Sequence, residues 1–276
     1  MKKRWKWIAL FDYAVMVFII LISVAPLLWI LISSFKTNKQ ILSSAFSLPD
    51  SLYLEGYAIA IEKANIPMRF LTSVIVAGSS TVLAVLIYSL AAYVLARVEF
   101  RGRNLLFFLL LSSMLIPSNA MVQPIYFVIR SLGLYDTKAG LILVYTGFAM
   151  AMTLALMRSA FLGIPRELEE AAYLDGAGFF RAFFQIMLPV AKPAMASSAI
   201  LAFINSWNEF LFAMMLTSSE SNRTMPLMIK YFTSSFSFNY TSMFAALVLC
   251  IVPTLVLYVI LQERVAESMI AGSVKG

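Results

Sequence analysis

Six apolar runs, separated by short charged segments, occupy most of this chain of 276 residues. A helix needs about 20 predominantly apolar residues to cross the roughly 30 Å of hydrocarbon in a bilayer, and each run is close to that length or longer. The sequence therefore predicts an all-α, polytopic membrane protein, folded as a single domain over residues 1–276. We expect the first span to lie at the periphery and the core helices to occupy about 70–262. The predicted spans are residues 8–34, 70–96, 105–129, 139–161, 193–216 and 243–261.

The composition excludes several classes of function. Hydrophobic residues make up 61% of the chain and charged residues 13%, which is far more apolar than a soluble domain. Histidine is absent and the lone cysteine, Cys250, lies in an apolar run, so we expect no metal site, no disulfide, no catalytic residues and no enzymatic activity. The formal charge of +7 does not predict nucleic-acid binding, because the basic residues lie in short clusters between apolar runs.

The distribution of lysine and arginine predicts how the chain is oriented. Six spans place both termini on one side of the membrane, and cytoplasmic segments carry an excess of basic residues. The basic N-terminal segment, the tight turn at 97–103 and the interval 163–192 would share one side, and together with the C-terminal tail they hold more lysine and arginine than the segments opposite. We therefore predict cytoplasmic N and C termini in a multi-pass protein of the cell membrane.

One interval on the predicted cytoplasmic side contains a short charged helix, expected at about 165–177. Pro165 suits the first position of a helix because its missing N–H would be unpaired there, and acidic residues follow at the positive end of the helix dipole. Gly176 supplies a stop. The helix is too short to cross a bilayer. It is either a docking helix for another protein or an amphipathic helix on the membrane surface, and spacing alone leaves both interpretations open.

The third apolar run is interrupted by Pro117 and Pro124, with the polar Asn119 and Gln123 beside them. A broken helix at membrane depth is tolerated only where protein or a water-lined cavity satisfies the freed backbone groups. Asn119 and Gln123 are therefore candidates for a pathway through the membrane. A proline kink packed inside the helix bundle is an equally favoured alternative.

The fifth run carries Asn205, Asn208 and Glu209, which would share one face of a continuous helix. Ionisable residues within a membrane are candidates for function, so these three side chains are further candidates for the pathway. The more favoured alternative is that they hydrogen-bond to neighbouring helices and stabilise the bundle, because this is the commoner use of such groups.

The charged interval also resembles a known family signature. In order, its matching residues are Glu170, Ala171, Ala172, Gly176, Ile186, Leu188 and Pro189. At this spacing they are similar to the EAA signature of the permease subunits of bacterial ATP-binding cassette (ABC) importers. The resemblance extends over nearly the whole chain and is to the carbohydrate branch, as a maltose-type second permease subunit. Further similar segments are 116–118, 132–134, 164–165, 175–176, 207–210 and 272–276.

The resemblance implies the type I ABC importer permease fold and a bacterial cell-membrane location. It also implies a second permease subunit in a heterodimer, two ATPase subunits, an extracytoplasmic solute-binding protein and contact with membrane lipid. The two permeases would form the pathway for a sugar or oligosaccharide. This chain would bind no cofactor, because no GxxxxGK[ST] phosphate loop is present in its sequence, and ATP and Mg²⁺ would be bound by the ATPase subunits.

The resemblance assigns roles to individual residues. The coupling helix would contact an ATPase subunit, through Glu167, Glu170, Ala171, Ala172, Asp175 and Gly176. A second ATPase contact is expected at the C-terminal tail, Ser273, Val274, Lys275 and Gly276. The loop at 217–240 is similar to one that meets the binding protein, and its candidate contacts are Arg223, Met225 and Pro226. A solvated connector is the alternative for that loop, although it is longer than most connections.

The sequence leaves two alternative functions open. One is an ABC importer for a peptide, an amino acid or another solute, since the coupling signature is shared across substrates. The other is a secondary transporter that needs no ATPase, which would be expected to show an inverted hydropathy repeat and titratable residues at the midplane. No such repeat is apparent, and Glu209 is the only strong titratable candidate.

Overall fold

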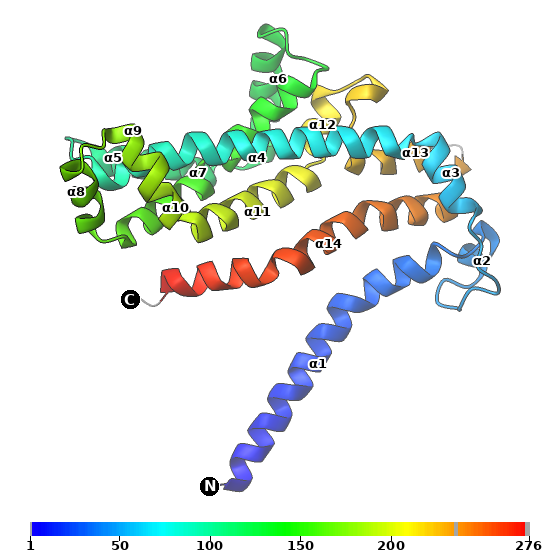
Figure 1. The fold of residues 1–276 in the computed structure, drawn as a ribbon. Helices are drawn as coiled ribbons and strands as arrows, with labels where there is room; N and C mark the ends of the chain where they lie inside the picture. The colour runs from blue at the N-terminus through cyan, green and yellow to red at the C-terminus, as the bar shows by residue number, and fades with distance from the viewer. Residues whose placement is uncertain (1, 235–236, 274–276) are drawn as a thin grey trace. The chain divides into compact units, whose positions relative to one another are not determined.

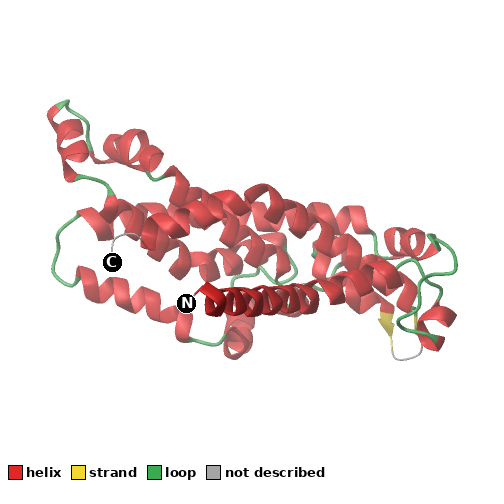
Figure 2. Ribbon diagram, turned by 90° about the horizontal axis from the view of Figure 1, so that it is seen from below, coloured by secondary structure: helices red, strands yellow, loops and turns green. Residues whose placement is uncertain are grey.

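The computed structural model describes residues 2–234 and 237–273, and helices account for most of this part of the chain (Figures 1 and 2). Contacts divide the chain into two compact units. Unit 1 comprises Met1–Ile66 and Met228–Val252, and unit 2 comprises Pro67–Leu227 and Pro253–Gly276. The sequence predicts a single domain, so this division is a feature that hydropathy alone does not indicate.

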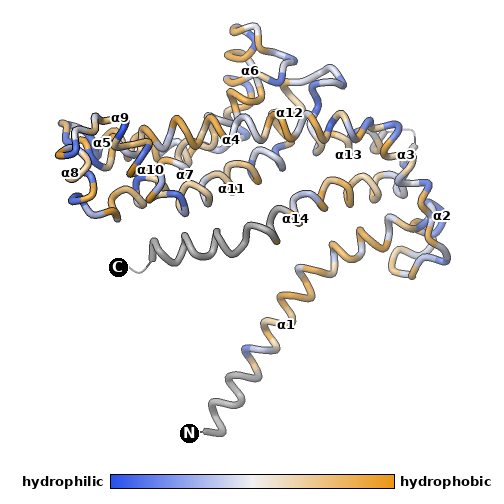
Figure 3. The backbone as a smooth tube through the Cα atoms, in the orientation of Figure 1, coloured by the Kyte–Doolittle hydropathy of each residue, from blue (hydrophilic) through white to orange (hydrophobic). Residues whose placement is uncertain are grey.

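Unit 1 begins with the long helix α1 (Lys2–Ser33), in which Phe11–Ser33 is strongly apolar (Figure 3) and residues 11–28 are exposed. Its other helices are α2 (Asn38–Ser43), α3 (Glu55–Lys63), α13 (Ile229–Phe232) and the first part of α14 (Tyr240–Ser273). Two short strands, β1 (Thr233–Ser234) and β2 (Ser237–Phe238), pair antiparallel.

The C-terminal end of α1 is fixed within unit 1 by polar and aromatic contacts. The indole N–H of Trp29 donates to the Ala45 carbonyl at 2.9 Å, and its ring packs edge-on against Phe244 at 5.1 Å. The ammonium of the fully buried Lys36 donates to the same carbonyl at 2.9 Å. A buried charge is costly unless it is hydrogen-bonded, so these contacts compensate the burial of Lys36.

Unit 2 contains the other long helices. Its helical elements are α4 (Ile66–Arg97), α5 (Arg103–Leu111), η1 (Ser112–Leu115), η2 (Ser118–Met121), α6 (Val122–Ser131), α7 (Lys138–Gly163), α8 (Arg166–Leu174), α9 (Phe179–Ala182), η3 (Phe183–Met187), α10 (Leu188–Val190), α11 (Lys192–Asn208), α12 (Leu211–Leu216), η4 (Glu220–Asn222) and η5 (Met225–Met228).

Two apolar clusters form the core of unit 2. One gathers the ends of α4 and α7 with η3, around Tyr93, Met157 and Phe183. The other joins α4, α6, α7 and α12, around Tyr145 and Phe212. Helices α7 and α11 pack along one another, and α12 packs against α6 (Figure 1). The two clusters lie toward opposite ends of α7, which places one beside α8 and the other beside α12.

The predicted spans correspond to α1, α4, the α5–α6 pair, α7, α11 with α12, and α14. Within the described residues, three helices are long and apolar enough to cross a membrane alone, and up to five spans result if each of two bent pairs is one span. The apolar part of α14, Tyr240–Val256, is shorter. The third predicted span is broken as expected, because Arg103–Leu115 and Ser118–Ser131 meet at an angle of 94°.

Candidate functional site

Helix α8 forms where the sequence predicts the short charged helix. It begins at Arg166, one residue after Pro165, whose backbone is extended with φ −55° and ψ 140°. Glu167 and Glu169 lie in its first turn, where the helix dipole stabilises negative charge. Its nine residues span about 14 Å at 1.5 Å per residue, so α8 cannot cross a bilayer.

The end of α8 is fixed by a left-handed glycine. Gly176 has φ 81°, a conformation that costs a residue with a side chain about 1 kcal/mol or more. Its N–H donates to the Tyr173 carbonyl at 3.0 Å, and the Ala177 N–H donates to the Ala172 carbonyl at 2.9 Å. This pair of bonds is the Schellman motif, which satisfies the last carbonyls of the helix. The prediction that Gly176 ends the helix is confirmed.

The exposed side of α8 carries most of the residues assigned to the coupling contact. Glu167, Glu170 and Ala171 are exposed, as are the following Asp175 and Gly176. Ala172, in contrast, is only 4% exposed. Successive residues of a helix point about 100° apart, so Ala171 and Ala172 do not share a face. The expectation that both alanines lie on the docking surface is therefore wrong for Ala172, which packs inward.

The buried side of α8 is attached to α4 by a polar network. The hydroxyl of Tyr93 donates a hydrogen bond to the carboxylate of Glu169, and the Tyr173 hydroxyl donates to the same carboxylate at 3.3 Å. The guanidinium of Arg97 lies 3.5 Å from Glu169 and donates to the Ile164 carbonyl at 2.5 Å. The side chains of Arg97 and Glu169 are 6% and 12% exposed, so this charge pair is shielded from solvent.

Aromatic rings enclose the network on its inner side. The ring of Tyr93, which is fully buried, lies 5.5 Å from Phe161 and 5.2 Å from both Phe179 and Phe183, measured between centroids. These rings come from α7, α9 and η3, so α8 is tied to several elements through one tyrosine. Nothing in the local sequence pattern points to Tyr93, and Glu169 is one of several acidic residues near the start of the predicted helix. The i, i+3 spacing of Glu169 and Ala172 is the signal that marks the buried face.

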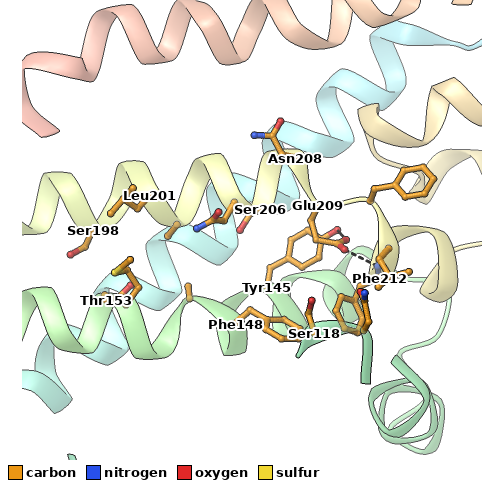
Figure 4. A pocket seen from close by; sticks show the side chains of 17 residues that line it. Ser118, Tyr145, Phe148, Thr153, Ser198, Leu201, Ser206, Asn208, Glu209 and Phe212 are labelled. Atoms are coloured by element: carbon orange, nitrogen blue, oxygen red, sulfur yellow. Dashed lines mark hydrogen bonds between the residues drawn. The ribbon is translucent and has the colours of Figure 1, made fainter. Parts of the chain in front are cut away.

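A cavity of about 490 Å³ lies in unit 2 where two helix breaks approach each other (Figure 4). The first break separates η1 from η2 at Pro117. The second separates α11 from α12, because Glu209 adopts an extended backbone with φ −67° and ψ 126°. The prediction of one continuous helix over 193–216 is therefore wrong, although Asn205, Asn208 and Glu209 all line the cavity. The lining residues are Ser118, Asn119, Tyr145, Phe148, Ala149, Met152, Thr153, Ser198, Leu201, Ala202, Asn205, Ser206, Asn208, Glu209, Phe210, Leu211 and Phe212.

The carboxylate of Glu209 holds the second break together. It accepts the Phe212 N–H at 2.8 Å and the Ala213 N–H at 3.0 Å, and the Tyr145 hydroxyl donates to it at 2.7 Å (Figure 4). The two N–H groups belong to the first turn of α12, which has no helical partners for them. Of the two interpretations that the sequence leaves open, Glu209 follows the structural one, because it bonds to its neighbours.

The asparagines of the cavity behave differently from Glu209. Asn119, Asn205 and Asn208 all line the cavity, and within the described residues none of their side chains makes a hydrogen bond. Gln123 is exposed on α6 and is not among the lining residues. With Glu209, the structure thus brings four of the five predicted pathway residues together and leaves Gln123 outside.

Residues 84–270, which include α8 and the cavity, match the family described as the inner membrane component of binding-protein-dependent transport systems. This chain belongs to that family. It is 40% identical to the diacetylchitobiose uptake system permease protein of Streptomyces coelicolor, over 96% of this chain and 88% of the relative. It is 33% identical to the trehalose transport system permease protein of Mycobacterium tuberculosis, over 91% and 92%.

A solved structure shows that the fold is that of an ABC importer permease. The structure is of a bacterial ABC transporter involved in the import of the acidic polysaccharide alginate, and the match has a TM-score of 0.82. It covers 94% of this chain and 96% of the other at 23% identity. The all-α, polytopic type I permease fold expected from the sequence is confirmed. The chain is therefore a multi-pass membrane permease, of the family of inner membrane components of binding-protein-dependent transport systems.

The loop between α12 and α13 of this permease holds the candidate contacts with a binding protein. The side chain of Arg223 is 30% exposed and pairs with Glu220, which also pairs with the buried Arg69. Met225 and Pro226 are buried, and the Met225 N–H donates to the Ser73 hydroxyl at 2.7 Å. Met225 and Pro226 were expected on the surface and are not, because they pack into the protein. Arg223 alone of the three keeps a partly exposed side chain.

The C-terminal residues assigned to a second ATPase contact are at the edge of the described chain. Helix α14 ends at Ser273, and Val274, Lys275 and Gly276 lie outside the described residues. The contact at Ser273 to Gly276 stays a prediction.

Proposed function

We propose that this permease is one membrane subunit of an ABC importer for a sugar or oligosaccharide. Its partners would be a second permease, two ATPase subunits and an extracytoplasmic solute-binding protein. Membership of the binding-protein-dependent family supports the binding-protein partner. The names of the two relatives, for diacetylchitobiose and trehalose, support a carbohydrate substrate. A non-sugar solute and an ATPase-independent transporter are not favoured, because no observation on this chain points to either.

The observation that carries this proposal is the two-sided character of α8. Glu167, Glu170 and Ala171 are exposed, while Glu169 on the opposite side is bonded to Tyr93 of α4. A helix held in this way moves with α4 and leaves its charged surface free for an ATPase subunit. ATP and Mg²⁺ would be bound by that subunit, since this sequence contains no phosphate loop.

The proposed orientation places α8 and both termini in the cytoplasm. Arg97, Arg101 and Arg103 lie at or beside the turn between α4 and α5, near α8, and such basic turns favour the cytoplasmic side. Arg223 would then lie on the extracytoplasmic side, where it could contact the binding protein. Labelling of intact cells tests this orientation. In a Cys250→Ala background, a membrane-impermeant thiol reagent should label Ser218→Cys and should not label Glu170→Cys.

Transport by the whole complex tests the function. Membrane vesicles containing the complete importer and its binding protein should take up labelled diacetylchitobiose, trehalose or another neutral oligosaccharide when ATP is supplied. Vesicles lacking this subunit should not. A complex that hydrolyses ATP and imports a peptide or an amino acid, but none of a broad sugar panel, would contradict the proposal.

A further inference from the structure

We infer that the cavity between the two helix breaks is a substrate-contacting site contributed by this subunit, and that it takes an uncharged saccharide through Asn119, Asn205 and Asn208. This inference rests on the proposed function and goes further, because a permease subunit can line an importer without touching its cargo. Some polar groups of the cavity are already hydrogen-bonded within the protein, and others are free.

Both helix breaks place irregular backbone beside the same cavity. Pro117 and Ser118 lie at the first break, and Glu209 and Phe210 at the second, and the cavity is lined from both sides. Irregular backbone at membrane depth persists only where protein covers it or a water-filled cavity borders it. In transporters, substrate sites are typically formed by such discontinuous helices. Two breaks that converge on one cavity therefore indicate a binding site. A kink that only relieved strain would not require a second break beside it.

The polar groups of the cavity fall into two sets. The carboxylate of Glu209 accepts hydrogen bonds from the Tyr145 hydroxyl and from two backbone N–H groups, so it already has partners within the protein. The amides of Asn119, Asn205 and Asn208 have no such bonds within the described residues. The hydroxyl of Ser198, a lining residue that is 1% exposed, also has no partner there. The Ser198 hydroxyl is buried and unpaired, which costs free energy unless water or a ligand meets it, whereas the three amides are exposed and so are free to bond a ligand.

The chemistry of the free groups matches a polyol. A primary amide both donates and accepts hydrogen bonds, as a sugar hydroxyl does. Phe148 and Phe212, with ring centroids 4.9 Å apart, add an apolar wall that can face the C–H side of a sugar (Figure 4). The volume of about 490 Å³ lies within the range of small-molecule sites.

The charges of the cavity select against acidic sugars. The lining residues include one carboxylate, Glu209, and no lysine or arginine. An anionic saccharide would enter a low-dielectric site without a cation to pair with and would face the carboxyl group of Glu209. A neutral saccharide meets neither cost.

Protection from chemical labelling tests the site directly. The chain has a single cysteine, so Asn205→Cys and Asn119→Cys can be made in a Cys250→Ala background of the complete importer. A small thiol reagent should label both positions in membranes. Sugar supplied with the binding protein, using diacetylchitobiose and trehalose as probes, should slow labelling by about tenfold at a concentration ten times the apparent Kd. Gln123→Cys, on α6 outside the cavity, should be labelled at the same rate with or without sugar.

The outcomes separate this inference from the function on which it rests. If the wild-type importer transports none of the sugars, the proposed function fails. If the wild type transports a sugar, but both engineered cysteines are unreactive or unprotected, the second permease or lipid fills the cavity and the inference is overturned. If one variant does not assemble, the other decides. Asn205→Ala should also raise KM for uptake about three- to tenfold, the effect of one lost hydrogen bond, while an unchanged KM counts against the site.

Discussion

The hydroxyl of Tyr93 on α4 donates a hydrogen bond to the carboxylate of Glu169 on α8, although the two residues are separated by 76 positions in the sequence. Tyr93 is fully buried among three phenylalanine rings, and Glu169 is also paired with Arg97. A short helix attached in this way has little freedom to tilt on its own. We expect α8 to transmit movement between its exposed surface and α4.

Removal of this hydrogen bond should impair coupling more than assembly. In Tyr93→Phe the aromatic packing is kept and the bond to Glu169 is lost, at a cost of about 1.5–3 kcal/mol for a bond to a charged group. We expect normal assembly with the ATPase subunits, unchanged basal ATP hydrolysis and a fall of about tenfold in ATP-driven uptake. Tyr135→Phe, at an exposed tyrosine, is the matched control. Normal uptake by Tyr93→Phe would show that the bond has no role in transmission.

Glu209 should be a determinant of stability. Glu209→Ala removes two hydrogen bonds at the start of α12 and the bond from the Tyr145 hydroxyl on α7, so we expect a loss of about 2–3 kcal/mol in the free energy of unfolding. Glu209→Gln keeps one acceptor oxygen and should lose less. Thermal unfolding of the purified complex measures both. Equal melting temperatures for wild type and Glu209→Ala would contradict the assignment of Glu209 to the fold.

Asp136 should make the connection between α6 and α7 sensitive to acid. The carboxylate accepts the N–H groups of Ser218 and Ser219 at 2.8 and 2.9 Å, and both hydroxyls also donate to it. Partial burial raises the pKa of Asp136, but the hydrogen bonds from Ser219 and Ser218 outweigh it and hold the pKa well below its usual value. The pKa of Asp136 is therefore lower in the folded protein than in the unfolded chain, where it is about 3.9. The carboxylate stabilises the folded state fully above a pH of about 3.9, and this stabilisation is lost as the pH falls from there toward the pKa of the folded state.

Replacement by asparagine tests the role of Asp136. Asp136→Asn should lower the free energy of unfolding by about 1–2 kcal/mol at neutral pH, because the amide replaces one acceptor oxygen with a donor. It should also weaken the fall in stability below about pH 4. Asp50→Asn, at another loop carboxylate, serves as the control. An Asp136→Asn protein with the same acid sensitivity as wild type would exclude this carboxylate as the cause.

Gly140, near the start of α7, is a test of close packing. A Cβ atom at this position would collide with the backbone carbonyl of Leu134 and lie 3.3 Å from a methyl group of Ile129. Backbone atoms cannot move aside easily, so Gly140→Ala should cost about 1–3 kcal/mol. Gly147→Ala, on the same helix with open space around it, should be neutral or slightly stabilising. The difference between the two melting temperatures is the measurement, and equal values would contradict the observed packing.

The sequence predicts the apolar spans and the position of α8 well, for identifiable physical reasons. Length and hydropathy locate the spans. Pro165 marks the start of α8 because proline suits the first turn of a helix, and Gly176 marks its end because glycine adopts the left-handed conformation at little cost. The break at Pro117 is likewise visible in the sequence.

The second break and the network around Tyr93 could not be predicted in the same way. Glu209 ends α11 without a proline or glycine, because its carboxylate captures the N–H groups of Phe212 and Ala213 and an acceptor of this kind depends on the fold. The partnership of Tyr93 and Glu169 joins distant segments, and no local pattern encodes it. The burial of Met225 also depends on a contact between distant segments, because its backbone N–H donates to the Ser73 hydroxyl on another helix.

The coupling role of α8 is tested most directly by measuring ATPase association and sugar uptake of the Glu170→Lys importer. Glu170 is exposed on α8 and has no structural partner within the described residues, so the reversal of charge should leave the fold of this subunit intact. Glu62→Lys, on α3, controls for the change in charge. We predict that Glu170→Lys reduces ATPase association and abolishes most ATP-driven uptake, whereas Glu62→Lys behaves as wild type. Normal association and normal uptake by Glu170→Lys would contradict the assignment of α8 as the coupling element.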